Sequence, residues 1–463
     1  MEIGITNKLV EFVGNHAFEN IPLHVISLAK QHILNTLGCM LLGSNNDAIN
    51  KTRSLCEELG GACEATIAGA SFAANAVFAS LINGFQGDAF ELGDRHTESG
   101  LHPGPMIVPA ALAMAERIHA NGMTFLNAVV VGYEAGCRIG SAIMPSRYER
   151  GWYFGTAGTF GAVAAAAKVL NLRGNQLGHA LGLAGAQAFS PTFSYRSDAK
   201  YFNVGKAAMA GVLSALLAQK GVTGGLSILE GNPEADPLAH SFFEMVGGAP
   251  KVERIYEGLG VSYELERCSL KPYSCCGDMH SSIDAAFSIK HKYDVRPEEI
   301  KAIRVGSFRT VPTRFNIPAP QTSLEAMLSF QHGIATALFA DQVLPEQFTM
   351  EWVNNPVIDR IRKVISLEVD AELDKYWPTQ RAATVEVATP RGNFAETVIA
   401  PKGTFENPLT ESEVQKQFLS MAGGVIPRPS AEKLGERVYN LEKIEDIHEI
   451  TILLKKSSAG KGM

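Results

Sequence analysis

Several side chains able to move protons or bind metal share one short segment of the chain. Glu91, Asp94, His96 and His102 lie within ELGDRHTESGLHPGP, whose Gly and Pro residues interrupt helices. Loops of this kind often carry binding and catalytic residues. Their spacing alone leaves three interpretations open: acid–base chemistry, a metal site that includes Asp94, and a solvated surface loop.

A second such segment, LKPYSCCGDMH, ends at His280, where an amphipathic helix is expected to begin. A histidine in the first helical turn faces the positive end of the helix dipole, which favours neutral imidazole, the form that acts as a base. The adjacent Cys275 and Cys276 cannot both easily reach one iron–sulfur cluster. The segment therefore predicts acid–base chemistry.

Cationic groups precede two further helices. Arg150 and Tyr153 come just before the helix entry GTAG, whose free N–H groups suit an anion, although such an entry is more often a packing feature. Lys200 precedes a helix of small residues, where its ammonium group either reaches the surface or binds a substrate carboxylate. A lone histidine in an apolar helix, such as His332, is usually a hydrogen-bonded core residue.

Bulk properties exclude several classes of protein. The net charge is -7 and no run of Lys or Arg exceeds two residues, so nucleic acid is an unexpected partner. The motifs GxSxG, HExxH, GxxxxGK[ST] and a correctly spaced GxGxxG are absent, and the seven cysteines lack CxxC spacing. We therefore expect no cofactor and no metal. Without a signal-peptide pattern or an 18-residue apolar run, a cytoplasmic location off the membrane is expected.

Helical periodicity dominates from residue 5 to about residue 265. Helices are expected over Ile5 to Val13, His24 to Leu42, Ala48 to Leu59, Ala73 to Leu92, Val108 to Ala120 and Thr124 to Met144. Two Ala/Gly-rich stretches, 155–170 and 205–220, predict central buried helices that approach one another closely.

The pattern changes after about residue 265. IKAIRVGSF and ATVEVATPRGNFAETVIA alternate with period two, as strands do, and expected helices at 279–293 and 324–340 are interleaved with them. The helical pattern returns at Thr410. At 463 residues the chain exceeds a single core. The prediction is a mostly α protein with an all-α domain built from residues 1–267 and 404–463, and an α+β domain at 268–403.

Several segments, taken in order, resemble the MmgE/PrpD family, which includes 2-methylcitrate dehydratase, cis-aconitate decarboxylase and iminodisuccinate epimerase. The resemblance spans nearly the whole chain. The segments are LHP at 101–103, GTAG at 155–158 running to Lys168, AK at 199–200 before GKAA at 205–208, GVTG at 221–224 with LEG at 229–231, and KPYSCC at 271–276 with His280.

The resemblance implies a large all-α domain, an inserted α+β lid, a homodimer and a cofactor-free cleft between the domains that takes a small anionic polycarboxylate. By position, His102, Lys200 and His280 match family active-site residues. Tyr153 stands in place of a usual active-site histidine. The other departures from the family pattern are Glu91 and Gly93 for acids of an Asp-x-Asp-Asp motif, Asn203 for a histidine and His332 for a tyrosine.

The reactions of this family develop charge beside a carboxylate, and fixed cations must stabilise that charge. Lys200 and Arg150 are the candidate cations. His102, His280 and Tyr153 are the candidate acids and bases. Substrate-binding roles are expected for Glu91, Asp94, His96, Arg150, Cys275 and His332.

The leading expectation is a cofactor-independent hydro-lyase that removes a proton next to a carboxylate of a 2-methylcitrate-like substrate. Three alternatives remain open: an epimerase of a dicarboxylic amino acid derivative such as iminodisuccinate, a cis-aconitate-type decarboxylase, and an inactive binding protein with the same fold.

Overall fold

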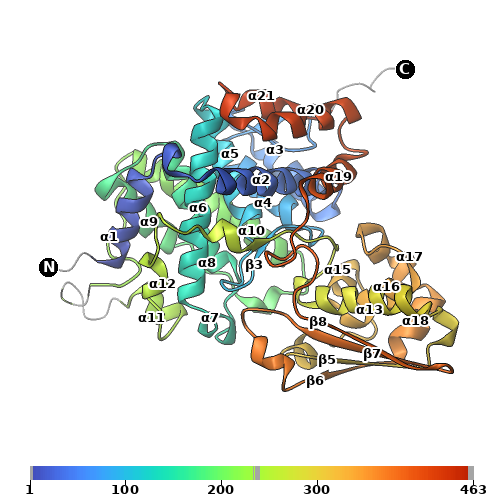
Figure 1. The fold of residues 1–463 in the computed structure, drawn as a ribbon. Coiled ribbons are helices and arrows are strands. Elements are labelled where there is room, and N and C mark those ends of the chain that lie inside the picture. The colour runs from blue at the N-terminus through green and yellow to red at the C-terminus, as the bar shows by residue number, and fades with distance from the viewer. Residues whose placement is uncertain (1–3, 233, 235–239, 457–463) are drawn as a thin grey trace, which may run out of the picture. The chain divides into compact units, whose positions relative to one another are not determined.

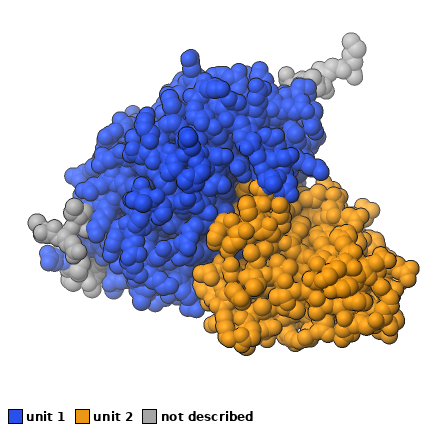
Figure 2. Space-filling view, viewed as in Figure 1, with its two compact units in different colours: residues 1–89, 93–268, 410–463 blue, residues 90–92, 269–409 orange. Residues whose placement is uncertain are grey.

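The computed structural model describes residues 4–232, 234 and 240–456, which fall into two compact units. Unit 1 comprises Met1–Ala89, Gly93–Cys268 and Thr410–Met463, and unit 2 comprises Phe90–Leu92 and Ser269–Leu409 (Figure 2). The predicted boundaries were 267/268 and 403/404, whereas the units change at 268/269 and 409/410. The short segment 90–92, which carries Glu91, belongs to unit 2 and was expected in the first domain.

Unit 1 is built almost entirely of helices (Figure 1). Its strands are two-residue pieces: β1 (Ala65–Thr66), β2 (Ala73–Ala74) and β3 (Arg95–His96). Strand β4 (Cys268–Ser269) contains the last residue of this part of unit 1 and the first that follows it in unit 2. The helices are α1 (Ile5–Asn15), α2 (Leu23–Gly43), α3 (Asp47–Leu59), α4 (Ala76–Asp88), α5 (Gly104–Arg117), α6 (Gly122–Ala142), α7 (Ser146–Glu149), α8 (Gly155–Val169), α9 (Gly174–Gly185), α10 (Ala199–Gln219), α11 (Phe242–Val246), α12 (Glu253–Tyr256), α19 (Glu411–Ala422), α20 (Arg428–Tyr439) and α21 (His448–Thr451).

The two Ala/Gly-rich helices lie at the centre of unit 1, as predicted. Every residue of α8 except Lys168 is buried, and α8 packs against α5, α6, α9 and α10. Helices α2 and α10 are long and apolar enough to cross a membrane by length and composition, but 78% and 67% of their apolar windows are buried inside the protein. Both are core helices of unit 1.

Glycines bring α4 close to its neighbours. A Cβ atom on Gly205 of α10 would lie 2.2 Å from the carbonyl oxygen of Leu81 in α4, closer than real Cβ contacts come. A Cβ atom on Gly87 would lie 3.0 Å from the Cβ of Pro105 in α5. Larger side chains at these positions would push the helices apart, so glycine allows α4 to approach both α5 and α10.

Three helices of unit 1 have boundaries that differ clearly from the predicted ones. The helix expected over 73–92 is α4, which begins at Ala76 after the capping side chain of Asn75 and ends at Asp88. Helix α5 begins at Gly104, four residues before the predicted Val108. Helix α10 begins at Ala199 instead of Gly205, so Lys200 lies in its first turn rather than before it.

Unit 2 contains a four-stranded sheet in the order β6-β5-β7-β8. The strands are β5 (Ala302–Ser307), β6 (Ile365–Val369), β7 (Ala383–Thr389) and β8 (Gly392–Val398). Strands β5 and β6 are parallel and the other pairs antiparallel. In β7 buried and half-exposed residues alternate, which fixes the register because a one-residue slip would expose the core face. The predicted strands at β5, β7 and β8 are confirmed.

The helices of unit 2 are α13 (His280–Tyr293), α14 (Val311–Arg314), α15 (Ser323–Leu328), α16 (Phe330–Phe339), α17 (Met350–Val353) and α18 (Pro356–Lys363), and α13 packs on β7 and β8. The prediction of a single helix at 324–340 was wrong. Ser329 is extended, its hydroxyl accepts from the His332 N–H and donates to the Ile317 carbonyl, and the chain divides there into α15 and α16. Strand β6 was missed.

Candidate functional site

The carboxylate of Asp88 joins two of the predicted catalytic residues. His102 Nδ1 donates to Asp88 Oδ1 at 2.7 Å, and Lys200 Nζ donates to Asp88 Oδ2 at 3.1 Å. The side chains of Asp88 and Lys200 are 0% and 1% exposed, and that of His102 is 12% exposed. Charge-assisted hydrogen bonds in such a buried place are stronger than surface ion pairs, because little water screens them. All three residues belong to unit 1.

Aromatic rings cover this cluster. The Phe154 ring stacks on His102 with centroids 4.5 Å apart and an interplanar angle of 22°. Lys200 Nζ lies 4.5 Å from the centroid of the Tyr201 ring and 5.9 Å from that of Phe154, within the range of cation–π attraction. Tyr153 contacts Phe154, with ring centroids 3.8 Å apart. The predicted residue Tyr153 is thus linked to His102 through the Phe154 ring.

Asp94 holds the chain beside His102. Its Oδ1 accepts from the backbone N–H of Gly104, the first residue of α5, at 2.7 Å. Its Oδ2 accepts from His32 Nδ1 at 2.7 Å and from the Tyr133 hydroxyl at 2.6 Å. The Asp94 carboxylate is fully buried and both of its oxygens bond protein groups. Asp94 therefore anchors the start of α5, which follows His102 by two residues.

His96 belongs to a buried ion network. Its Nδ1 lies 2.9 Å from the Ser99 hydroxyl. Its Nε2 lies 2.9 Å from Glu264 Oε2, which is close enough for an ion pair, although the contact does not have the geometry of a hydrogen bond. Burial acts to raise the pKa of Glu264, but His96 and Arg138 lower it to about 2. Burial raises the pKa of Glu134, which Arg138 also contacts, to about 7. In this structure His96 contacts internal residues of unit 1.

The guanidinium of Arg150 is exposed and donates to the carbonyl of Glu244 in α11 at 3.3 Å. The buried arginine nearest in sequence is Arg147. It donates to the carbonyls of Ser99 at 3.0 Å and Trp152 at 3.1 Å, so it ties together two segments that carry predicted site residues. The anion-stabilising role of Arg150 stays a prediction.

In unit 2, Glu91 and Cys275 lie near Lys271. Lys271 Nζ is 3.5 Å from Glu91 Oε2. Cys275 is fully buried, and burial raises the pKa of its thiol well above the usual value, so the thiol stays protonated. His280 begins α13 as predicted; its Nε2 lies 3.4 Å from the Cys275 carbonyl, and its ring meets that of Tyr273 edge-on.

His332 is a hydrogen-bonded core residue of unit 2. Its Nε2 lies 2.9 Å from the Gln347 carbonyl, and its Nδ1 lies 3.5 Å from Arg362 Nη1. Burial lowers the pKa of His332 to about 4, and the charge of Arg362 acts in the same direction. The imidazole is therefore neutral at pH 7. Its proposed contact with substrate stays a prediction.

Asp88 is the residue that the sequence analysis missed. It was counted within an apolar helix, where an acid is rarely fully buried without a partner. The presence of an acid in an apolar helix was therefore the available signal in the sequence. Its partners are Lys200 of α10 and His102 in the segment before α5. The structure brings His102, Lys200 and Tyr153 into one cluster of unit 1. Glu91, Cys275 and His280 form a second cluster in unit 2.

Models of the MmgE/PrpD N-terminal and C-terminal domains match residues 7–235 and 273–453. The chain belongs to the MmgE/PrpD family. Its relatives include a protein of Aspergillus terreus named cis-aconitate decarboxylase, which is 28% identical over 97% of this chain and 96% of the relative. Proteins of the same name from Homo sapiens and Mus musculus are 25% and 24% identical, over 98% of this chain and 95% and 94% of their own lengths.

Unit 1 also has a pocket of about 670 Å³ where α1 and α8 end. Lys168 and Arg173 line it, together with Glu19 and Glu445. Lys168 donates to the carbonyls at the end of α1, and burial lowers its pKa to about 8. The two carboxylates and the bonded lysine leave little net positive charge for an anion.

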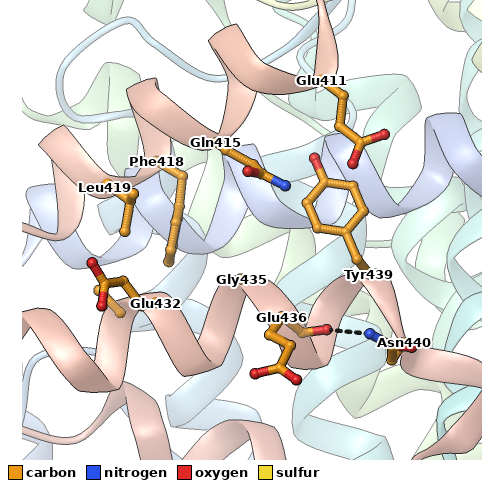
Figure 3. A pocket seen from close by; sticks show the side chains of 10 residues that line it. Glu411, Gln415, Phe418, Leu419, Glu432, Gly435, Glu436, Tyr439 and Asn440 are labelled. Carbon is orange, nitrogen blue, oxygen red and sulfur yellow. Dashed lines mark hydrogen bonds between the residues drawn. The ribbon is translucent and has the colours of Figure 1, made fainter.

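A further pocket of about 400 Å³ lies between α19 and α20, with Phe418 and Tyr439 in its wall (Figure 3). Glu411, Glu432 and Glu436 surround it, so a polycarboxylate would meet repulsion there. Neither pocket is lined by a residue that the sequence predicted. Within residues 4–232, 234 and 240–456, no group of three or more His, Cys, Asp and Glu side chains is placed to hold a metal ion.

Proposed function

We propose that the protein is a cofactor-independent lyase that acts on a small polycarboxylate, with Lys200 binding a substrate carboxylate and His102 transferring a proton. The observation that carries the proposal is the contact of both side chains with the single buried carboxylate of Asp88, which keeps an ammonium group and an imidazole side by side. A proton-transfer group next to a fixed cation is what charge development beside a carboxylate requires.

The reaction we favour is loss of carbon dioxide from a cis-aconitate-like tricarboxylate, which the names of the relatives support. The bond to the departing carboxyl group breaks, and its electron pair forms a new carbon–carbon double bond. The electron pair of the original double bond moves to the far alkene carbon and the carboxylate on it. A proton then adds to the far alkene carbon, which bears a retained carboxylate. Carbon dioxide and a five-carbon unsaturated dicarboxylate are the products.

Each group has a defined task in this scheme. The imidazolium form of His102 donates the proton, and the Lys200 ammonium offsets the negative charge on the carboxylate next to the accepting carbon. The Phe154 and Tyr201 rings beside these groups provide low polarity, in which the electrostatic attraction is stronger than in water.

Dehydration of a 2-methylcitrate-like substrate is the second candidate. The neutral form of His102 has a lone pair for removing a proton next to a carboxylate, and its contact with Asp88 orients it equally well for that task. Elimination then also needs an acid for the departing hydroxyl group, and Tyr153 next to Phe154 is the candidate.

Incubation with cis-aconitate, 2-methylcitrate and iminodisuccinate in separate reactions tests the proposal. We expect ¹³C NMR to show carbon dioxide and a five-carbon dicarboxylate from cis-aconitate, at a rate that falls by orders of magnitude in Lys200→Ala. Formation of an alkene without carbon dioxide would establish the dehydratase instead. Deuterium exchange at a stereocentre with neither product would establish an epimerase.

Thermal stabilisation by all three compounds without turnover of any would contradict the proposal and support a binding protein. We also propose three properties that were expected from the sequence. The protein forms a homodimer, its α+β region acts as a lid, and its location is cytoplasmic. Light scattering of the purified protein tests the dimer.

A further inference from the structure

We propose that Asp88 is a positioning residue that fixes the tautomer of His102, so that His102 meets substrate through Nε2. This inference rests on the proposed function for its catalytic meaning, but the tautomer itself is a property of the protein without substrate. An ionised carboxylate only accepts hydrogen bonds. The contact of 2.7 Å between Asp88 Oδ1 and His102 Nδ1 therefore requires the proton on Nδ1.

Two further contacts hold this arrangement. Lys200 bonds the other oxygen of Asp88 at 3.1 Å, which stabilises the ionised form of a carboxylate that has no exposed surface. Phe154 stacks on His102 at 4.5 Å and restricts tilting of the imidazole. Rotation of the ring by half a turn would place a carbon atom where Nδ1 now bonds Asp88, leaving a buried carboxylate oxygen without that partner.

The helix packing explains why Asp88 can reach both groups. Asp88 is the last residue of α4. A Cβ atom on the preceding residue, Gly87, would lie only 3.0 Å from the Cβ of Pro105 in α5, so glycine permits this close approach. Gly205, five residues after Lys200, allows α10 to pack against the backbone of α4. A carboxylate on a regular helix between two closely packed neighbours has few alternative positions, which is the property that a positioning residue needs.

This tautomer determines which nitrogen of His102 exchanges a proton with the substrate. With Nδ1 committed to Asp88, Nε2 is the nitrogen that carries the transferred proton in the imidazolium form and the lone pair in the neutral form. Asp88 thus supports His102 as an acid in decarboxylation and as a base in dehydration, without touching the substrate. Removing its carboxylate should lower kcat more than it changes KM, because the orientation of His102 matters most in the transition state.

The closing experiment compares Lys200→Met with the double variant Asp88→Ala/Lys200→Met by ¹⁵N NMR of histidine-labelled protein. The two differ only at position 88, and neither leaves Lys200 buried without a counter-ion, which would itself destabilise the fold. His102 is assigned by the signal lost in His102→Gln. We expect the neutral imidazole to carry its proton on Nδ1 in the native chain and in Lys200→Met, and the Nδ1–H form to decrease in the double variant.

Kinetics supply the second measurement. Asp88→Asn should lower kcat by on the order of 10² to 10⁴, because the amide cannot accept from both His102 and Lys200. The matched control is Glu116→Gln, which alters another buried carboxylate that accepts several hydrogen bonds, at the far end of α5. Its kcat should stay within about twofold of the native value.

An Nε2–H tautomer in the native chain, or equal Nδ1–H populations in both Lys200 variants, would overturn the inference. If the proposed function alone is wrong, the native chain shows no turnover while the difference in tautomer remains. The two failures are therefore distinguishable.

Discussion

Both units contain a lysine and a carboxylate that are buried together, and the Asp88–Lys200 and Glu91–Lys271 pairs differ in how the carboxylate is held. In unit 1, Asp88 lies in the last turn of a regular helix, and its two oxygens accept from Lys200 at 3.1 Å and from His102 at 2.7 Å. In unit 2, Glu91 adopts a left-handed backbone with a φ of 56°, and its carboxylate lies 3.5 Å from Lys271. Left-handed backbone at a non-glycine residue costs about 1–2 kcal/mol.

The difference teaches that the same ion pair can be fixed by different means. Helix packing holds Asp88, because small residues let α4, α5 and α10 approach one another. Glu91 lies on a three-residue segment that belongs to unit 2 although its chain neighbours belong to unit 1. The position of its side chain therefore depends on a strained backbone rather than on a helix.

The largest expected effects test whether acid–base chemistry belongs to one cluster or to both. We expect His102→Gln and His280→Gln each to lower kcat by on the order of 10² to 10⁴, since each removes a group that the sequence predicts to act as an acid or a base. Steady-state kinetics with the compound that the incubation experiment shows to be turned over measures the change. The control is His119→Gln, at an exposed histidine of unit 1. Native turnover in His280→Gln would confine the chemistry to the Asp88 cluster.

Replacing Lys200 removes the cation of the Asp88 cluster. Lys200→Ala should lower kcat/KM by on the order of 10² to 10³, because a fixed charge near the reacting carboxylate is lost. Circular dichroism should show an unchanged helical content. Lys220→Ala, at the exposed end of α10, is the matched control and should leave kcat/KM unchanged. Turnover near the native rate in Lys200→Ala would rule out our assignment of Lys200.

The pair in unit 2 is expected to act mainly on stability. Lys271→Met leaves Glu91 as a buried charge without this lysine and should lower the free energy of unfolding by about 3–5 kcal/mol. The double variant Glu91→Gln/Lys271→Met should recover most of the loss, because both charges are then removed. Denaturant titration measures both. A loss below about 1 kcal/mol in Lys271→Met would mean that Glu91 is well stabilised without it.

The smallest expected effect is a pH dependence of unit 2. Burial lowers the pKa of His332 from 6.5 to about 4, so in that pH range the unfolded chain binds a proton that the folded chain does not. Stability is therefore lost as pH falls from about 6.5 to about 4, by up to about 3 kcal/mol. His332→Phe should flatten this part of the stability curve, whereas the exposed-site variant His291→Phe should not. An unchanged slope in His332→Phe would contradict the assignment.

Much of the fold was predictable because its determinants are local. Period-two alternation identified β5, β7 and β8, and the small residues of α8 identified a buried central helix. The predictions failed where a tertiary contact decided the backbone. Ser329 ends one helix and caps the next by accepting from the His332 N–H, and the same hydroxyl bonds the Ile317 carbonyl, twelve residues earlier in the chain. No periodicity within 324–340 contains that information.

The sequence by itself determined the types of group available, a mostly helical architecture and membership of the MmgE/PrpD family through residues such as His102, Lys200 and His280. Only the tertiary structure decided that Asp88, an unremarked acid at the end of an apolar helix, bonds His102 and Lys200. The physical reason is that a buried carboxylate must find partners, and those partners lie 14 and 112 residues away. Helix packing brings them together, and spacing along the chain does not record it.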